Sequence, residues 1–426
     1  METAIQDLKK SGVTLKQYVL GRRDTDINTG TLIIGRYLAL DKSEGSDVYM
    51  DALRPHVLLI CGKRGYGKSY TMGTLIEELA SLPHQVKSNI AAFVIDTMGI
   101  FWTMRHENKK ETGILLRWGL SPEGFSIEVF VPAGSLGQYE GEHIQVKPFS
   151  LSVSELSGYD WCALFGTDPV SPLGVFVIRI IEYLKEKTAA FSIENILEAV
   201  GREQDINRTI RNAAQNYFSV AGSWGIFDKK GASISDMLHG GAISILDLSS
   251  LDNQNIKAIA VKILSKKIYD ERIKARRSYE RTQMGDKCME TGIPMVWMFI
   301  DEAHMFIPRE RETAASGVLL NEWLRQGRQP GLSIIFATQR PSSLHSDVLS
   351  QSDMIICHRL TAQDDIRALE AIRPTYMRES IGEALKKMGT EKGIAFIVDD
   401  TSETAHVVRM RPRKSWHGGD EPSAAG

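Results

Sequence analysis

The chain has 426 residues, a formal net charge of −2 at pH 7 and 24% charged residues. Its length allows two to three folding units with a sizeable core. The balanced charge excludes a polycation, so any nucleic-acid contact has to come from local basic surfaces such as 262–281 or 409–414. The four cysteines, at 61, 162, 288 and 357, are scattered, which favours reduced thiols over a disulfide framework or a zinc site.

The first 55 residues contain one strand-like stretch, 31–40, and predict a short N-terminal β segment over 1–55. They contain no signal-peptide core, and the longest apolar stretches of the chain are interrupted by charge, as at Arg179 within 175–184. We therefore expect a cytoplasmic protein that does not span a membrane.

Short apolar runs recur along the chain and alternate with helix-like segments. They predict an α/β fold with a mostly parallel sheet, in which strands occupy 56–61, 90–95, 127–131, 242–248, 295–300, 332–337, 354–357 and 394–398. Between 151 and 240 the pattern becomes helical and predicts a helical insertion, with helices over 172–187, 193–200 and 205–218 and no strand. The sheet domain is thus predicted in two parts, 56–150 and 241–412. A long helix is expected to begin at an N-cap, Asp252, and to carry a basic, solvated face to about 279.

A phosphate-binding loop follows the first of these strands. Residues 62–69, GKRGYGKS, match the pattern G-x-x-x-x-G-K-[ST] between a strand and a helix. Gly62, Gly65 and Gly67 let backbone N–H groups curl around phosphate oxygens, Lys68 reaches the β and γ phosphates, and Ser69 binds Mg²⁺. Tyr70 completes the predicted nucleotide-binding set, with ATP and Mg²⁺ as the ligands.

A second buried strand, 295–300, ends in two acids. Next to a phosphate loop, Asp301 is predicted to hold Mg²⁺ through water and Glu302 to position the attacking water. The sequence Asp-Glu-Ala-His at 301–304 also occurs in two-lobed helicases, but only about 120 residues follow it, which is too few for a second motor lobe and its connections. No partner histidine has ligand spacing to His304, which favours a local structural or coupling role.

The strand 332–337 is expected beside 295–300, with its carboxyl end facing the γ-phosphate. Gln339 would then act as a neutral sensor of that phosphate or of the lytic water. Arg325 and Arg328 precede the strand and so lie at its other end. A phosphate role for either requires a neighbouring subunit and a ring, whereas the alternative is a basic helix terminus that interacts favourably with the helix dipole. Spacing alone does not separate these two interpretations.

The combination of GKRGYGKS, FIDEAH, LRQGRQPGLSIIFATQRPSSL and VLSQSDMIICHRL resembles the HerA branch of the HerA/FtsK superfamily of hexameric DNA-translocating P-loop ATPases. The resemblance spans roughly 30–412. It implies a RecA-like core, a homo-hexamer, translocation of double-stranded DNA and a docked nuclease or other effector. It also favours Arg328 over Arg325 as an arginine finger supplied in trans. The corresponding segment of the family lies near a subunit boundary, which would place 409–414 there, although a flexible tail is an equally good interpretation. We expect residues 413–426 to form a flexible tail.

Two departures from that family are visible. Only about 55 residues precede the phosphate loop, so the family's N-terminal β-barrel is reduced and docking of the usual nuclease is in doubt. Asp96 begins a segment in which the family often has Gly-Glu, and it is a further candidate to face the nucleotide. Candidate pore residues are 305–311 and 109–110, for which a charged surface loop is the alternative.

The leading hypothesis is a ring-forming ATPase, helicase-like in sequence, that moves duplex DNA together with an effector in DNA processing or antiviral defence. The alternative is a nucleotide-gated scaffold that assembles and activates an effector without processive movement. A secretion or conjugation motor is a third possibility, although such motors usually carry a membrane anchor.

Overall fold

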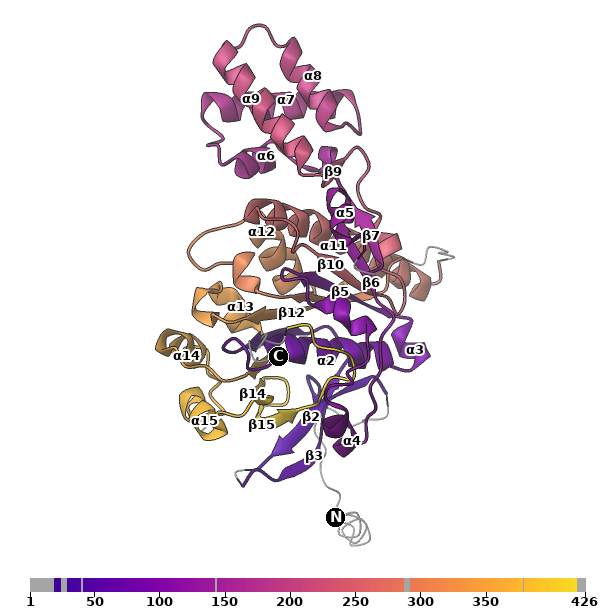
Figure 1. The fold of residues 1–426 in the computed structure, drawn as a ribbon, viewed down its shortest axis with the longest axis vertical. Coiled ribbons are helices and arrows are strands. Elements are labelled where there is room, and N and C mark those ends of the chain that lie inside the picture. The colour runs from indigo at the N-terminus through magenta and orange to yellow at the C-terminus, as the bar shows by residue number, and fades with distance from the viewer. Residues whose placement is uncertain are drawn as a thin grey trace.

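The computed structural model describes residues 19–23, 29–39, 41–141, 144–286, 292–377 and 379–419. Within these ranges the strands join into one 13-stranded sheet and one two-stranded sheet (Figure 1). The strands are β1 Val19–Leu20, β2 Thr31–Leu38, β3 Glu44–Asp51, β4 Val57–Cys61, β5 Ile90–Asp96, β6 Glu128–Pro132, β7 Val146–Phe149, β8 Leu151–Ser152, β9 Phe227–Asp228, β10 Ile243–Asp247, β11 Met295–Ile300, β12 Leu332–Thr338, β13 Met354–Cys357, β14 Ile394–Asp399 and β15 Thr404–Met410.

The helices connect and cover the strands. They are α2 Lys68–Ser81, α3 His84–Lys87, α4 Thr112–Arg117, α5 Leu136–Tyr139, α6 Gly158–Phe165, α7 Pro172–Lys187, α8 Ile193–Arg202, α9 Arg208–Ser223, α10 Ile234–Met237, α11 Gln254–Gln283, α12 Ser316–Val318, α13 Ser346–Gln351, α14 Gln363–Glu370 and α15 Ile381–Met388. Short 3₁₀ turns occupy Phe101–Arg105, Ala133–Ser135, Val153–Glu155, Ala303–Met305 and Pro341–Ser343, and a π-helical turn spans Leu319–Arg325. None of the helices that the structure describes has both the length and the apolar character of a membrane span.

The large sheet has the order β1-β3-β2-β15-β14-β13-β4-β12-β11-β5-β10-β6-β7. From β13 to β7 every neighbouring pair is parallel, whereas β14, β15, β2 and β3 add antiparallel strands on the other side. The predicted α/β fold with a mostly parallel sheet is therefore confirmed. The N-terminal strands extend this sheet through the β2–β15 pairing and do not form a separate barrel.

Both faces of the parallel part are buried, which explains why its strands are apolar without alternation. Along β4, Leu58 and Ile60 pack into the core on the α2 side, and Leu59 and Cys61 pack into the core on the α11 side. Cys61 lies opposite Cys357 in the β4–β13 register. These two cysteines and Cys162 are free, buried thiols, while Cys288 lies outside the described residues.

The helices α6 to α9 stand away from the sheet at one end of the molecule (Figure 1). Serines define their starts: Ser157 and Ser192 form capping boxes, and Ser171 caps α7 with Pro172 at its first position. Their core is aromatic, with the Trp161 ring 5.1 Å from that of Phe218. The expectation of no strand between 151 and 240 was wrong, because β8 and β9 pair at the base of this insertion. Such two-residue strands are too short for a periodic signal.

The helix α11 differs from its prediction in its cap, whereas its basic face is solvated as expected. Asn253, not Asp252, is the N-cap, and its side chain accepts the Asn255 N–H at 2.8 Å. Several of the cations pair with carboxylates, as Lys262 does with Asp160 and Lys267 with Glu155. Lys266, Lys274 and Arg276 have carboxylate partners as well, so much of the positive charge of this exposed face is balanced by nearby acids.

Candidate functional site

The phosphate-binding loop connects the carboxyl end of β4 to the start of α2. Gly65 and Gly67 have φ angles of 77° and 114°, and Gly62 has a φ of 155°. A Cβ on Gly62 would lie 2.6 Å from the Cβ of His358. The glycines are thus required both for left-handed backbone and for close approach of the next loop.

Lys68 begins α2 and is 6% exposed. Burial lowers the pKa of Lys68, while the carboxylates of Glu302 and Asp301 act in the opposite direction. This ammonium group therefore lies beside both predicted acids of β11. A buried cation next to the left-handed glycines is what a polyphosphate chain requires.

Asp301 follows β11 and is 2% exposed. Burial and the charge of Glu302 raise the pKa of Asp301 to about 6, against the effects of the Glu302 N–H, of Lys68 and of the Ser69 hydroxyl. The two predicted Mg²⁺ ligands, Ser69 and Asp301, therefore adjoin each other. The described residues contain no cluster of three His, Cys, Asp or Glu side chains arranged to hold a metal ion. A hydroxyl, one carboxylate and phosphate oxygens with water fit Mg²⁺ bound together with a nucleotide.

Glu302 adopts a left-handed backbone, with φ 49° and ψ 48°. For a residue with a side chain this conformation is uncommon, and it occurs most often where function requires it. The Oε1 atom accepts a hydrogen bond from Nε2 of Gln339. The Oε2 atom is buried, lies 3.3 Å from His304 Nδ1, and has no hydrogen-bond partner among the described residues. The Glu302 carboxylate is thus held between Gln339 and His304 at the carboxyl edge of the sheet.

The strand order explains why these side chains meet. β12 lies between β4 and β11, so the phosphate loop, Gln339 and the two acids leave three adjacent parallel strands at the same edge. His304 Nδ1 also lies 3.1 Å from Thr338 Oγ1, which links the acidic turn to the end of β12. The expected placement of β12 beside β11 is therefore confirmed. The catalytic roles of these residues remain predictions.

Asp96 does not present a free carboxylate to the nucleotide. Its oxygens accept four backbone N–H groups, those of Met98 at 3.1 Å and of Gly99, Ile100 and Phe101 at 2.8 Å each. Burial and the neighbouring Asp247 raise its pKa to about 7. Asp96 therefore shapes the loop that follows β5.

Arg325 and Arg328 lie at the opposite edge, before β12, and the structure does not bring them to their own phosphate loop. Arg325 Nη2 lies 2.5 Å from Asp347, and Arg328 Nη2 lies 3.6 Å from Asp353. Their side chains are 51% and 78% exposed. The turn between them and β12 is held from behind by Arg272, which donates to the Pro330 carbonyl at 2.6 and 2.8 Å.

Other predictions for the loops around the site require correction. Within 305–311, Phe306 and Ile307 are fully buried, so they belong to the core and only the exposed 309–311 stretch is available to a pore. Residues 413–419 of the predicted flexible tail pack against α2, with Arg413 and Ser415 buried, and 420–426 lie outside the described residues. The nucleotide-binding role predicted for Tyr70 stays a prediction; its hydroxyl donates to Glu111 and accepts the Arg413 N–H, at 2.7 Å each.

Sequence reasoning about the site missed His358 and Arg359. His358 is fully buried between Thr71 Oγ1 at 2.9 Å and the Ile394 carbonyl at 3.0 Å, and burial lowers its pKa to about 4. Arg359 accepts the Lys63 N–H through its carbonyl and lies over the Tyr66 ring at 5.3 Å. Both residues brace the phosphate loop. The sequence His-Arg-Leu at 358–360 was noted as part of the resemblance to the HerA branch, but it was not interpreted as part of the site.

Comparison with known proteins identifies related sequences and folds. The family model described as helicase HerA, central domain, matches residues 32–268, more than half of the chain, and a model for zonular occludens toxin matches 230–376. The DNA double-strand break repair helicase HerA of Pyrococcus furiosus is 25% identical over 262 residues, which cover 56% of this chain and 44% of that protein. A probable DNA double-strand break repair helicase HerA of Methanocaldococcus jannaschii is 30% identical over 133 residues, covering 31% of this chain and 25% of the relative.

Among solved structures, VirB4 of Thermoanaerobacter pseudethanolicus superposes with a TM-score of 0.55 at 12% identity, covering 92% of this chain and 98% of that one. This likeness concerns the fold alone. The chain spans less than half of the length of the curated relatives described above.

Proposed function

Because the chain belongs to the family of the HerA helicase central domain, we propose that it is a ring-forming ATPase that uses Mg²⁺ and ATP to move double-stranded DNA. The observation that carries this proposal is the contact between Gln339 and Glu302 beside the buried Lys68. A phosphate loop alone would support nucleotide binding, whereas a carboxylate held by an amide next to it supports hydrolysis.

The hydrolytic roles follow from the chemistry of each group. Glu302, with one oxygen held by Gln339 and the other without a hydrogen-bond partner in the described structure, positions the attacking water and takes its proton. Lys68 stabilises charge on the transferred phosphoryl group, and Gln339 senses its presence through Glu302. Ser69 and Asp301 would hold Mg²⁺, which when bound neutralises charge on the phosphate oxygens.

The proposed ring is a homo-hexamer in which Arg328 of one subunit acts on the nucleotide of the next. The high exposure of Arg328 and its position at the edge opposite the phosphate loop support this role. Arg325 is the second candidate. The proposed partners are double-stranded DNA and an effector protein such as a nuclease, in DNA processing or antiviral defence. The exposed loop 309–311, with Arg309 and Arg311, is the DNA-facing candidate.

The test is steady-state ATP hydrolysis with and without linear duplex DNA, by wild type and Glu302→Gln, on samples of determined mass. We expect hydrolysis by a hexamer, stimulation by DNA that weakens as salt increases, and a loss of about 10²–10⁴-fold in Glu302→Gln. Glu198→Gln is a matched control of the same chemical change, since Glu198 is an exposed residue of α8 that pairs only with the exposed Arg202 among the ion pairs of the described residues. Hydrolysis by an intact ring that ignores DNA would contradict the translocase and leave the nucleotide-gated scaffold.

A further inference from the structure

The C-terminal segment 411–419, here called the strap, runs along the outer face of α2. Arg411 and Arg413 are each 1% exposed and bind the fully buried Glu77 of α2 at 2.9 and 3.4 Å. Glu77 also accepts the Lys414 N–H at 3.0 Å and the Ser415 N–H at 2.9 Å. A buried carboxylate satisfied in this way fixes the strap to the helix that begins at the phosphate loop.

The end of the strap is fixed a second time, near the first turn of α2. The Trp416 N–H donates to the His106 carbonyl at 2.7 Å, and the Trp416 carbonyl accepts the Thr103 hydroxyl at 3.0 Å. The His417 ring meets the Tyr70 ring edge-on, with centroids 5.4 Å apart. The strap therefore contacts the first turn of α2 through Tyr70, the residue that directly follows Ser69.

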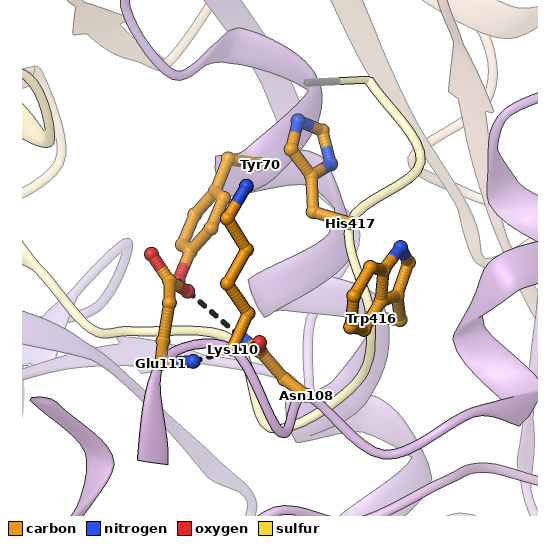
Figure 2. A pocket seen from close by; sticks show the side chains of 6 residues that line it. All are labelled: Tyr70, Asn108, Lys110, Glu111, Trp416 and His417. Carbon is orange, nitrogen blue, oxygen red and sulfur yellow. Dashed lines mark hydrogen bonds between the residues drawn. The ribbon is translucent and has the colours of Figure 1, made fainter. Parts of the chain in front are cut away.

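A small hollow of about 20 Å³ opens at this place, so a base would rest against the side chains at its rim and would not enter it. Figure 2 shows it between Tyr70 and Lys110 on one side and Trp416 and His417 on the other, with Asn108 and Glu111 at its base. The Trp416 side chain remains 39% exposed although the backbone on both sides of it is held. Two aromatic rings and an imidazole around a hollow provide the flat surfaces on which a heterocyclic base packs.

The direction of a nucleotide in the site leads to the same hollow. In a phosphate loop, the lysine reaches the β and γ phosphates while the backbone amides cradle the α and β phosphates. The γ end therefore lies toward Glu302 and Gln339, and the α end lies toward the first turn of α2. A nucleoside attached to the α-phosphate would then leave the loop on the side where the His417 ring of the strap meets the Tyr70 ring.

We propose that the strap forms the nucleobase subsite of this ATPase, with the base packed against Trp416 and His417. This inference rests on the proposed nucleotide site. Asn108 and Glu111 already bond each other at 2.7 Å, and Asn108 also donates to the Arg413 carbonyl at 2.9 Å. Because Asn108 and one oxygen of Glu111 are engaged in this way, stacking is expected to contribute more to base binding than hydrogen bonds to the edge of the base. Analogues of ATP and GTP should therefore bind with comparable affinity.

The test compares two ligands of the full chain by titration calorimetry with Mg²⁺ present: a non-hydrolysable ATP analogue, and inorganic tripolyphosphate, which has no base. Trp416→Ala should weaken the ATP analogue by roughly tenfold, the size of one base–aromatic stack, and leave tripolyphosphate unchanged. Trp118→Ala is the matched control, because the Trp118 ring packs against the Arg36 guanidinium at 4.2 Å and does not line the hollow. It should bind both ligands as the wild type does.

The outcomes separate this inference from the proposed function. If Trp416→Ala binds the ATP analogue as wild type does, or loses both ligands equally, the base subsite is wrong while the phosphate site stands. If wild type binds neither ligand, the nucleotide site itself fails and the subsite fails with it.

A second measurement does not depend on the folding of the alanine variant. Trp416→Phe keeps an aromatic ring, and its emission spectrum subtracted from that of wild type isolates the Trp416 signal. The ATP analogue should quench this difference signal and tripolyphosphate should not. Quenching by neither ligand, or equally by both, would overturn the subsite.

Discussion

The two edges of the parallel sheet both contain buried carboxylates, but in different states. At the carboxyl edge, Asp301 and Glu302 lie side by side, and burial raises the pKa of Asp301 to about 6. At the amino edge, Asp51 binds His56 Nε2 at 3.2 Å, Arg22 at 3.3 Å and the N–H groups of Leu53 and Arg54. The Asp51 carboxylate at the amino edge has several donors within the fold. At the carboxyl edge, by contrast, Glu302 Oε2 has no hydrogen-bond partner among the described residues.

This difference separates stability from function. A buried carboxylate with several donors contributes to folding, and its removal leaves other charges unpaired. A buried carboxylate with an open oxygen costs stability and is retained for what binds there. The amino edge also exposes Arg325 and Arg328, the kind of group that the carboxyl edge of another subunit would require.

The largest effect is expected for Arg328→Ala, which should slow ATP hydrolysis. If the arginine completes a neighbour's site, kcat should fall about 10³-fold or more, with nucleotide binding and melting temperature unchanged because the side chain is 78% exposed. Arg328→Lys should recover little, since an ammonium lacks the guanidinium fork.

Mixing subunits distinguishes a trans role of Arg328 from a cis role. Arg328→Ala and Glu302→Gln subunits, each inactive alone, should regain partial hydrolysis in mixed rings, because some boundaries then combine an intact Glu302 with an intact Arg328. The absence of any recovery in rings shown to be mixed would argue against a finger supplied in trans.

The next largest effect is expected for Asp51→Ala, which should lower the stability of the fold. It leaves His56 without one of its two carboxylates in a buried position, which should cost about 3–5 kcal/mol of unfolding free energy. Asp301→Asn is the contrasting variant at the other edge: it should abolish hydrolysis with an unchanged or higher melting temperature. Thermal unfolding of both variants tests the comparison, and equal destabilisation would remove the distinction between the edges.

A smaller effect is expected from pH through His56. The carboxylates of Asp51 and Asp353 outweigh burial and raise the pKa of His56 to about 9, above its ordinary value of 6.5. Its contribution to stability is therefore complete below pH 6.5 and is lost as pH rises through 9, on the order of 3 kcal/mol in all. Melting temperature should fall over this window in wild type and less in His56→Gln. The exposed His84→Gln should behave as wild type does, and an unchanged slope in His56→Gln would assign the pH dependence elsewhere.

The smallest effect is expected for Arg325→Ala. Its pairing with Asp347 involves a side chain that is 51% exposed, so its loss should cost no more than about 1 kcal/mol. Hydrolysis should remain near the wild-type rate. A loss as large as that of Arg328→Ala would show that both arginines act on the phosphate, and a loss in Arg325→Ala alone would exchange their roles.

Local sequence was sufficient to predict an element or a motif where the position tolerates only one kind of residue. The glycine-lysine-serine spacing at 62–69, the acids after β11 and the apolar strands were all recognisable, because sterics and burial restrict these positions. The resemblance to HerA, which rested on these motifs and the segment around Gln339, is confirmed by the family model. The α7 helix and strands β11 and β13 have their predicted bounds.

The sequence by itself therefore determined the class of fold and named the residues of the candidate phosphate site. Only the tertiary structure decided that Asp96 is engaged by four amides, that His56 joins Asp51 to Asp353, and that the strap closes on Tyr70 through Glu77. His56 and Asp353 are 297 positions apart and Glu77 and Ser415 are 338 apart, so no local pattern reports their contacts. Asp96 binds amides only two to five residues ahead, but these amides converge on it only in the folded loop after β5. A periodic pattern reports which face of an element is buried, but it does not report which distant side chain satisfies a buried charge there.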